Sequence, residues 1–412
     1  MSSSAPVADA VSTGLLHDGP TRLDYLDATR AFALVLGVVF HAGLSFMPVF
    51  MGWAVMDIST SPLVGGFILV SHAFRMELFF LLAGFFAHAS VHRRGTGAFV
   101  RSRLLRLGVP FVAGWFLLRP LLVSGWIMGS ASLRGNFDFW AGLREGVQSL
   151  QALPAGLFTG SHLWFLYYLA MITALVIAAR ASLKFTGLRG GIFAEHADRL
   201  FVRLVASRFS LLFLAGPTAL VLWFMGGPGW GMATPDQSLR PHGPVLLVYG
   251  GFFLFGWILD RQRARIEQCA RLSAARWTLA GIAIVATFLL SAIEQDPSHP
   301  YRMAGHVGYV VSYALMMWSL VFLSIGVFRK YCAQPRPWLR YVADSSYWMY
   351  LIHLPLVVWL QVAVAELPLH WSFKLAFISA ATVAVSLLTY ALCVRSTWLG
   401  WLLNGRRLPR PI

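Results

Sequence analysis

Ten apolar stretches, each long enough to cross a membrane as a helix, constrain this 412-residue chain more than any other feature of its sequence. About 20 apolar residues in a helix cover the roughly 30 Å of hydrocarbon in a bilayer. The hydrophobic share of 58% and the charged share of 12% exclude an ordinary soluble enzyme and a disordered chain. The predicted spans are residues 29–50, 62–90, 108–129, 162–179, 209–226, 243–259, 277–293, 304–328, 346–364 and 372–394.

The basic residues are distributed unevenly between the two sides that these spans define. Of the 33 lysines and arginines, 26 lie on the side of the N-terminus, whereas the loops on the opposite side hold four. Because loops rich in lysine and arginine stay in the cytoplasm, we expect both termini there. The predicted fold class is all-α, a polytopic transmembrane helical bundle of about ten spans. Its topology accounts for most of the net charge of +16, so no nucleic-acid partner is needed.

The segments outside the spans divide the chain into three parts. Residues 1–21 are small and polar and lack the regions of a signal peptide, which predicts a flexible cytoplasmic tail. Residues 22–395 form the membrane domain, and residues 396–412 form a basic cytoplasmic tail. In the longest outer loop, residues 130–161, apolar residues recur at helical spacing, and we expect a helix along the outer membrane surface.

Motifs for metal or nucleotide chemistry are missing from the sequence. The three cysteines, Cys269, Cys332 and Cys393, fit no metal-binding spacing, so we expect neither a disulfide nor a bound metal. There is no G-x-S-x-G, no Walker A and no H-E-x-x-H segment. Nothing therefore points to a covalent serine or to nucleotide hydrolysis.

The first span carries an arginine and a histidine on one face. Arg30 and His41 are eleven residues apart, so in a helix they lie within about 20° around the axis and about 16 Å apart along it. We expect Arg30 at the cytoplasmic mouth, with Asp27 in reach for an ion pair, and His41 near the middle of the membrane. An imidazole in such a place suits general-base catalysis. The alternatives are an arginine that only anchors the span and a histidine that only packs.

The second span holds three ionisable residues, which are costly inside a membrane and are therefore functional candidates. His72 and Arg75 are neighbours on the helix surface, whereas Glu77 points about 200° away from Arg75. Arg75 and Glu77 therefore cannot simply neutralise each other, and each needs a partner elsewhere. One interpretation is interhelical ion pairing, and the other is that Arg75 faces a site and meets a substrate anion or a carbonyl oxygen.

Basic and aromatic residues mark the two ends of the bundle. On the outer side, His162 and Trp164 begin the fourth span, while Tyr350 and His353 are adjacent in the ninth. We expect these four residues, with Asp27 and His72, to line the substrate site; an aromatic belt and core hydrogen bonding are the alternatives. The loop after the second span is polybasic, which fits anionic-lipid contact or a seat for a phosphate-rich coenzyme A nucleotide. Its candidate binding residues are Arg93, Arg101, Arg103 and Arg106.

These residues resemble the hallmarks of the acyltransferase-3 family of membrane acyltransferases. The first hallmark, an arginine and a histidine separated by ten residues in the first span, matches Arg30 and His41. The second, R-x-x-R near the cytoplasmic end of the third span, matches Arg103 and Arg106. The segments SHAFRMELFFLLAGFF, SHLWFL and YLIHLP are similar to a branch that resembles succinyltransferases of osmoregulated periplasmic glucans. The likeness covers nearly the whole chain.

The resemblance implies a reaction across a bacterial inner membrane. An acyl group, succinyl in the branch that this chain resembles, passes from cytoplasmic acyl-CoA to a hydroxyl of a periplasmic glucan. The acyl-CoA is a donor substrate, and no permanently bound cofactor is expected. With Arg30 at the mouth, His41 takes the proton of the sugar hydroxyl or accepts the acyl group itself. Arg75 stabilises the oxyanion or pairs with the carboxylate of a succinyl donor.

Two other functions stay open at this point. An O-acetyltransferase of another envelope polysaccharide or of a lipid-linked glycan fits the same residues. A proton-coupled transporter would use His41, Arg75 and Glu77 as a relay. The chain has no internal repeat, which counts against a transporter built from inverted repeats. No matched family motif requires an acid at Glu77, the least secure of the catalytic candidates.

Overall fold

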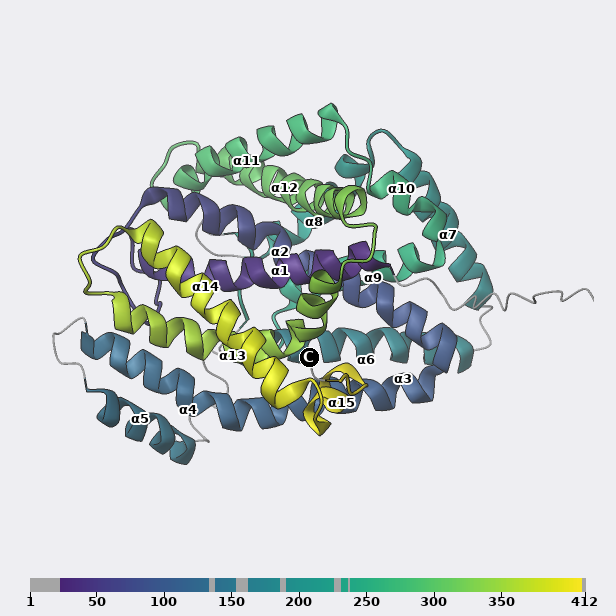
Figure 1. The fold of residues 1–412 in the computed structure, drawn as a ribbon. Helices are drawn as coiled ribbons and strands as arrows, with labels where there is room; N and C mark the ends of the chain where they lie inside the picture. The colour runs from purple at the N-terminus through teal and green to yellow at the C-terminus, as the bar shows by residue number, and fades with distance from the viewer. Residues whose placement is uncertain are drawn as a thin grey trace, which may run out of the picture.

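The structure, a computed structural model, describes residues 23–132, 138–152, 162–185, 190–225, 231–235 and 238–409. Within these ranges the chain forms helices and no strands. The long helices lie against one another across the molecule, with α1 and α2 in the middle of the bundle (Figure 1). This confirms the predicted class, an all-α multi-pass bundle. The predicted N-terminal tail lies outside the described residues.

Nine helical segments of the described residues are long and apolar enough to cross a membrane, and the number is ten if one bent pair counts as a single span. The helices of these nine segments are α1 (Asp24–Gly43), α2 (Pro62–Arg94), α3 (Thr96–Arg103) with α4 (Val109–Ser132), α6 (Trp164–Phe185), α9 (Gly243–Arg261), α11 (Ala274–Gln295), α12 (Arg302–Tyr331), α13 (Pro337–Val364) and α14 (Trp371–Thr389). The shorter helices are α5 (Phe139–Gln148), α7 (Gly190–Ala206), α8 (Ser210–Trp223), α10 (Ile266–Cys269) and α15 (Trp398–Asn404).

The fifth predicted span, residues 209–226, differs most from the prediction. Its helix, α8, has 14 residues, a length of about 21 Å, which is less than the thickness of the hydrocarbon layer. Phe209 N–H donates to the hydroxyl of Ser207 (3.1 Å) between the two helices, and α8 is bent by 116° from the second part of α7. The apolar run is therefore one arm of a bent pair and not a single long helix.

The first span starts and ends earlier than predicted. α1 begins at Asp24, and a short 3₁₀ turn continues it to Phe46. Met47 has an extended backbone (φ −66°, ψ 138°) and precedes Pro48, which disfavours helical geometry in the residue before it. His41 consequently lies in the last turn of α1, nearer the end of the helix than the central position that we predicted.

The next helix begins where its sequence signals a start. The hydroxyl of Ser61 accepts from Leu63 N–H (3.3 Å), and Pro62 occupies the first helical position. α2 then continues for 33 residues to Arg94 and ends at Gly95, whose φ is +77°. This long helix carries His72, Arg75 and Glu77 through the centre of the bundle.

The closest helix contact in the core joins α2 to α9 through two glycines. A Cβ atom on Gly84 of α2 would lie 1.9 Å from the carbonyl oxygen of Phe253, and one on Gly256 of α9 would lie 1.9 Å from that of Leu81. Only glycine fits at either position. Close packing of backbones through small residues is typical of helices in membranes, where apolar burial does not drive association.

The helix expected in the outer loop is present as α5. Asp138 caps it by accepting from Ala141 N–H (2.9 Å), and Gly142 and Gly146 pack closely against α4. Trp140 is 72% exposed on the free side of the helix. The prediction that α5 lies along a membrane surface stays a prediction.

The basic loops come together at one end of the bundle, here called the basic end. It comprises the start of α1, the ends of α2, α9 and α12, and the helices α3, α7, α10 and α15. Ion pairs connect these elements: Arg261 with Asp198 (2.6 Å) links α9 to α7, and Arg329 with Glu267 links α12 to α10. Helices α7 and α10 lie at the right in Figure 1. Part of the predicted basic tail, α15, packs against the bundle at this end.

Candidate functional site

One cavity of about 490 Å³ connects the basic end to the buried histidines. Six arginines and a single carboxylate, that of Asp344, line it among the described residues. Such a lining favours an anionic ligand, because clefts with one sign of charge concentrate ligands of the other. The arginines are Arg30, Arg75, Arg94, Arg103, Arg106 and Arg406, and the histidines are His41, His72, His162 and His353.

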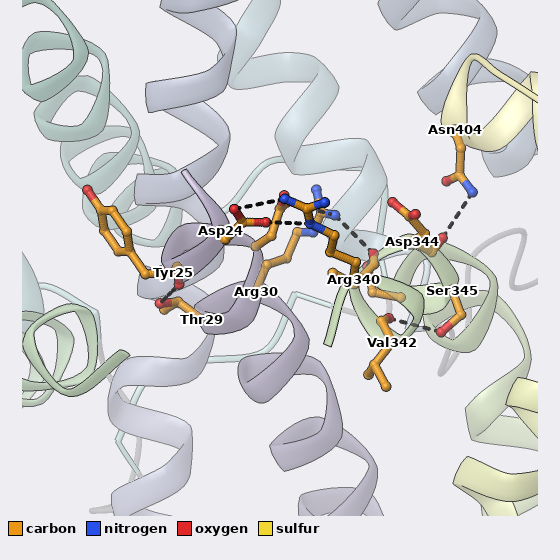
Figure 2. Close-up of polar contacts among 12 residues, drawn as sticks. Asp24, Tyr25, Thr29, Arg30, Arg340, Val342, Asp344, Ser345 and Asn404 are labelled. Carbon is orange, nitrogen blue, oxygen red and sulfur yellow. Dashed lines mark hydrogen bonds and ion pairs between the residues drawn. The ribbon is translucent and has the colours of Figure 1, made fainter. Parts of the chain in front are cut away.

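Arg30 is held at the mouth of this cavity by contacts with two helices. Its Nη2 lies 3.3 Å from the carboxylate of Asp27, one turn earlier on α1, and donates to the carbonyl oxygen of Ala343 on α13 (2.9 Å). The predicted ion pair with Asp27 is confirmed. Asp24 pairs with Arg340 nearby (2.7 Å), which joins the starts of α1 and α13 (Figure 2). Asp27 itself does not line the cavity.

The R-x-x-R arginines lie where α3 continues into α4 through a π-helical turn, Leu104–Gly108. The guanidinium of Arg103 lies over the ring of Phe99 (5.1 Å), and the hydroxyl of Tyr347 donates to the carbonyl oxygen of Arg106. Arg106 also packs directly on Gly405, where a Cβ atom would lie 1.7 Å from Nη2 and where φ is +76°. The end of α15 therefore covers the second arginine of the motif and requires glycine there.

α15 itself is tied to the cavity mouth by two polar contacts. Asn404 donates to the carbonyl oxygen of Asp344 (2.9 Å), which Figure 2 shows, and Arg406 pairs with the Asp344 carboxylate (3.1 Å). These residues belong to the predicted C-terminal tail. No local sequence pattern predicts these contacts, because they join residues about 60 positions apart in the chain.

His41 lies between two aromatic side chains at the far end of the cavity. Its ring is nearly parallel to Trp53 (18°, 5.7 Å between centroids) and is 5.4 Å from the ring of His353. Its Nδ1 is buried and has no hydrogen-bond partner among the described residues. A nitrogen in this state is available to a substrate or to a neighbouring side chain that rotates toward it.

Tyr350 and His353 of α13, both predicted at the site, lie beside His162. Tyr350 donates to the carbonyl oxygen of His162 (2.8 Å), and His162 Nε2 lies 2.9 Å from that of Leu351. His353 Nδ1 lies 2.8 Å from the carbonyl oxygen of Tyr350, so a proton on Nδ1 leaves Nε2 as an acceptor. The rings of His162 and His353 are 5.2 Å apart. The structure thus brings α1, α6 and α13 together around one group of imidazoles.

Arg75 crosses from α2 to α1 and is buried, with 5% exposure. Its guanidinium lies over the ring of Phe40 (4.2 Å) and against Gly37, where a Cβ atom would be 3.5 Å from Nη1. That Nη1 has no hydrogen-bond partner among the described residues. His72, on the same helix, stacks on the ring of Phe40 (5.5 Å between centroids). Its Nε2 lies 2.7 Å from the carbonyl oxygen of Met232.

Four predicted candidates do not reach the cavity. Glu77 is fully buried between helices, and neither carboxylate oxygen has a hydrogen-bond partner among the described residues. Arg93 folds back onto the carbonyl oxygen of Ala89 (3.1 Å), and Arg101 is exposed. Neither these three residues nor Asp27 is among the residues that line the cavity.

A cysteine nucleophile finds no support in the structure. Burial raises the pKa of the Cys269 thiol to about 12, which leaves little thiolate at neutral pH. Cys269 is not among the residues that line the cavity. Among the described residues, no group of three or more His, Cys, Asp or Glu side chains is arranged to hold a metal ion.

The arrangement supports chemistry between an anionic ligand and a proton acceptor. Five of the six arginines lie toward the basic end, whereas Arg75, whose Nη1 has no partner among the described residues, and the imidazole of His41 line the other end of the same cavity. Thr234, which is exposed in the loop before α9, also lines the cavity. The cavity therefore extends from the basic end toward a loop on the opposite side of the bundle.

Comparisons with known proteins relate the chain to one family. A family model described as an acyltransferase domain matches residues 23–391. The chain is similar to glucans biosynthesis protein C of Escherichia coli O81 (strain ED1a), with 24% identity over 408 residues. It is similarly 24% identical over 411 residues to glucans biosynthesis protein C of Escherichia coli K12. Both matches cover 94% of this chain and 96% of the relative. No solved structure matches the chain.

Proposed function

The chain belongs to the acyltransferase-3 family, whose model matches residues 23–391, and on this premise we propose that it transfers an acyl group from cytoplasmic acyl-CoA to a glycan on the outer side of a bacterial inner membrane. The protein is a multi-pass membrane acyltransferase. The donor, the direction and the acceptor are our proposal. The named relatives are glucans biosynthesis proteins, which favours a periplasmic glucan as the acceptor.

The single observation that carries the proposal is the charge and reach of the cavity. Its basic end has five arginines, Arg30, Arg94, Arg103, Arg106 and Arg406, which suit the phosphates of a coenzyme A nucleotide. The same cavity extends to His41 and Arg75. A donor bound by its nucleotide at the basic end would place its thioester near these two residues. The basic end then faces the cytoplasm, in agreement with the distribution of basic loops.

In the proposed reaction, His41 acts on the acceptor hydroxyl. The imidazole takes the hydroxyl proton while the hydroxyl oxygen attacks the thioester carbonyl carbon, and the carbonyl oxygen becomes an oxyanion. Arg75 stabilises that oxyanion, because its guanidinium is already buried beside α1 and has a free donor. When the carbon–sulfur bond breaks, the thiolate leaves and takes the proton from His41. An ester and free coenzyme A are the products.

A succinyl donor fits the lining better than an acetyl donor. Its second carboxylate needs a cation at the far end of the cavity, and Arg75 is the arginine at that end. Arg75 then pairs with this carboxylate, and the oxyanion is stabilised in part by the same guanidinium fork. An O-acetyltransferase that uses the same path is the alternative, and the family match favours either enzyme over a transporter.

Mass spectrometry of periplasmic glucans tests the proposal. Cells that lack the endogenous activity are complemented with this protein or with His41→Ala at matched membrane levels. We expect a succinyl mass increment with the wild-type protein and none with the variant. An acetyl increment would support the alternative donor, and no acyl increment on any envelope glycan would contradict the proposal.

Binding of the donor is measured separately on the purified protein. At a ligand concentration 100-fold above Kd, binding to the folded state alone stabilises it by about 2.7 kcal/mol. We expect succinyl-CoA and free CoA to raise the thermal unfolding temperature. If neither they nor acetyl-CoA shift it, the cavity does not take a coenzyme A donor.

A further inference from the structure

His41 is held by two residues that neither the family motifs nor the proposed reaction use. Gln361 of α13 is 1% exposed, and its Nε2 donates to the carbonyl oxygens of His41 (2.9 Å) and Ala42 (3.0 Å). Its Oε1 accepts from the indole N–H of Trp53 (2.9 Å). Trp53, in the loop between α1 and α2, in turn lies nearly parallel to the imidazole of His41. The four residues form a closed set of contacts.

The amide of Gln361 joins the last turn of α1 to another helix. The carbonyl oxygen of His41 already accepts from Leu44 N–H, and that of Ala42 lies 3.5 Å from the hydroxyl of Ser45. A carbonyl oxygen can accept two hydrogen bonds, and Gln361 gives each of these two a further donor, so the backbone of His41 is fixed to α13. Because the amide of Gln361 uses both its donor and its acceptor groups, it cannot rotate without losing hydrogen bonds.

Trp53 restricts the side chain, whereas Gln361 restricts the backbone. His41 lines the cavity and Trp53 does not, so the indole covers a part of the imidazole that does not face the cavity. Behind it, Trp126 of α4 contacts the indole edge-on (5.2 Å). The imidazole is therefore confined between this pair of tryptophans and the ring of His353.

We propose that Gln361 and Trp53 are positioning residues that hold the His41 imidazole in the orientation its proton transfer requires. This inference rests on the proposed function, since it assigns the residues a part in the same reaction. Neither residue touches the reacting atoms. Displacement of a reacting group by about 1 Å lowers rates by up to about 10²-fold, so loosening His41 lowers kcat without weakening donor binding.

The kinetic test uses the purified full-length protein with succinyl-CoA and periplasmic glucan. Gln361→Leu removes three hydrogen bonds, Trp53→Ala removes the stacked ring, and Trp53→Phe keeps a ring but removes the indole N–H. We expect Gln361→Leu and Trp53→Ala to lower kcat by about 10- to 100-fold, with the donor KM unchanged. Trp53→Phe recovers most of the kcat lost in Trp53→Ala, because the ring contact is restored.

Trp359→Phe is the matched control. Trp359 belongs to the same group of aromatic residues and donates its indole N–H to the carbonyl oxygen of Leu121 (2.9 Å). Like Trp53, it donates its indole N–H to an amide carbonyl oxygen, but its ring contacts Phe139 and not His41. We expect its kcat to equal that of the wild type. An equal loss of kcat in Trp359→Phe and Trp53→Ala would mean that packing, and not positioning of His41, is responsible.

A labelling experiment tests the positioning without any need for activity. Diethyl pyrocarbonate carbethoxylates accessible imidazole nitrogens, and peptide mass spectrometry reports its rate at His41. We expect Trp53→Ala and Gln361→Leu to raise that rate severalfold while Trp359→Phe leaves it unchanged. Unchanged labelling together with wild-type kcat in the first two variants overturns the positioning role. If the wild-type protein transfers no acyl group, the proposed function fails, while the labelling rates still decide whether Trp53 and Gln361 hold His41.

Discussion

The two ends of the cavity hold charged side chains in different ways. At the basic end, Arg30 pairs with Asp27 (3.3 Å) and Arg406 pairs with Asp344 (3.1 Å). At the far end, Arg75 is 5% exposed and its Nη1 has no partner among the described residues. Nε of Arg30 also lacks a partner among them, but the Nη2 of that residue is paired. Buried polar groups are nearly always hydrogen-bonded, so an unpartnered one calls for an explanation. Under the proposed function, the basic end binds by the sum of several charges, whereas the far end provides individual groups for the reaction.

The largest effect is expected at His41. His41→Ala removes the proposed proton acceptor, and general acid–base catalysis contributes about 10²–10⁴-fold. We therefore expect kcat to fall by that factor or more, with the donor KM little changed. Acyl transfer to glucan by the purified protein measures both constants. A kcat within a few-fold of the wild type would assign the proton transfer to another group, such as His353.

Arg75 is expected to have the second largest effect. Removal of a donor that stabilises an oxyanion costs about 10²–10³-fold in kcat, so we expect Arg75→Met to lose that much. Arg75→Lys keeps the charge but loses the planar fork that binds a carboxylate through two hydrogen bonds. We expect it to recover part of kcat and to lose the preference for succinyl-CoA over acetyl-CoA. Full retention of rate and donor preference in Arg75→Lys would argue against a bidentate contact.

Much of this far end followed from spacing within single helices. The spacing of eleven positions from Arg30 to His41 places both on one face of α1, and the structure places both on the cavity. The spacing of three positions from His72 to Arg75 likewise makes them neighbours on α2, and both line the cavity, whereas Glu77 does not. Helical spacing did not predict where His41 lies along the length of α1. His41 is in the last turn because the break before Pro48 depends on a loop, and helical periodicity does not locate that break.

Contacts between distant segments of the chain could not be predicted from the sequence. Trp53 and Gln361 carry no pattern that marks them, yet they meet at His41 from positions about 300 residues apart. α15 was assigned to a tail because a basic segment after the last apolar span reads as one. Its place on the cavity depends on Arg106 packing on Gly405 and on Asn404 reaching Asp344. The length of α8 was overestimated because the apolar residues Phe224 and Met225 continue the run past Trp223, where the helix ends in a turn.

Each arginine at the basic end is expected to contribute separately to binding of the donor. Hydrogen bonds to charged groups contribute about 1.5–3 kcal/mol, so we expect Arg106→Gln to raise the donor KM by roughly tenfold or more with kcat unchanged. Arg103→Gln has an effect of similar size, and higher ionic strength raises the wild-type KM in the same direction. Arg208→Gln, an exposed arginine that does not line the cavity, is the matched control. If the two cavity arginines behave like Arg208, the nucleotide is bound elsewhere.

The smallest effect is expected at Glu77. This residue is buried like Arg75, but it does not line the cavity, so it tests whether burial without contact to the cavity matters for the reaction. Glu77→Gln conserves the shape of the side chain and removes its ionisable group. Neither carboxylate oxygen accepts a hydrogen bond from the described residues, so the substitution breaks none of those contacts. We expect kcat and the donor KM to change by less than about threefold, which corresponds to less than about 0.7 kcal/mol.

Thermal unfolding, measured together with the kinetics, distinguishes the two roles that remain for Glu77. A kcat that falls 100-fold at unchanged stability would place Glu77 in the reaction, through a connection between α2 and the cavity that the present contacts lack. A loss of stability with unchanged kcat would instead mean that the carboxyl group supports the packing of α2 against its neighbours, and that burial alone does not mark a residue as part of the site.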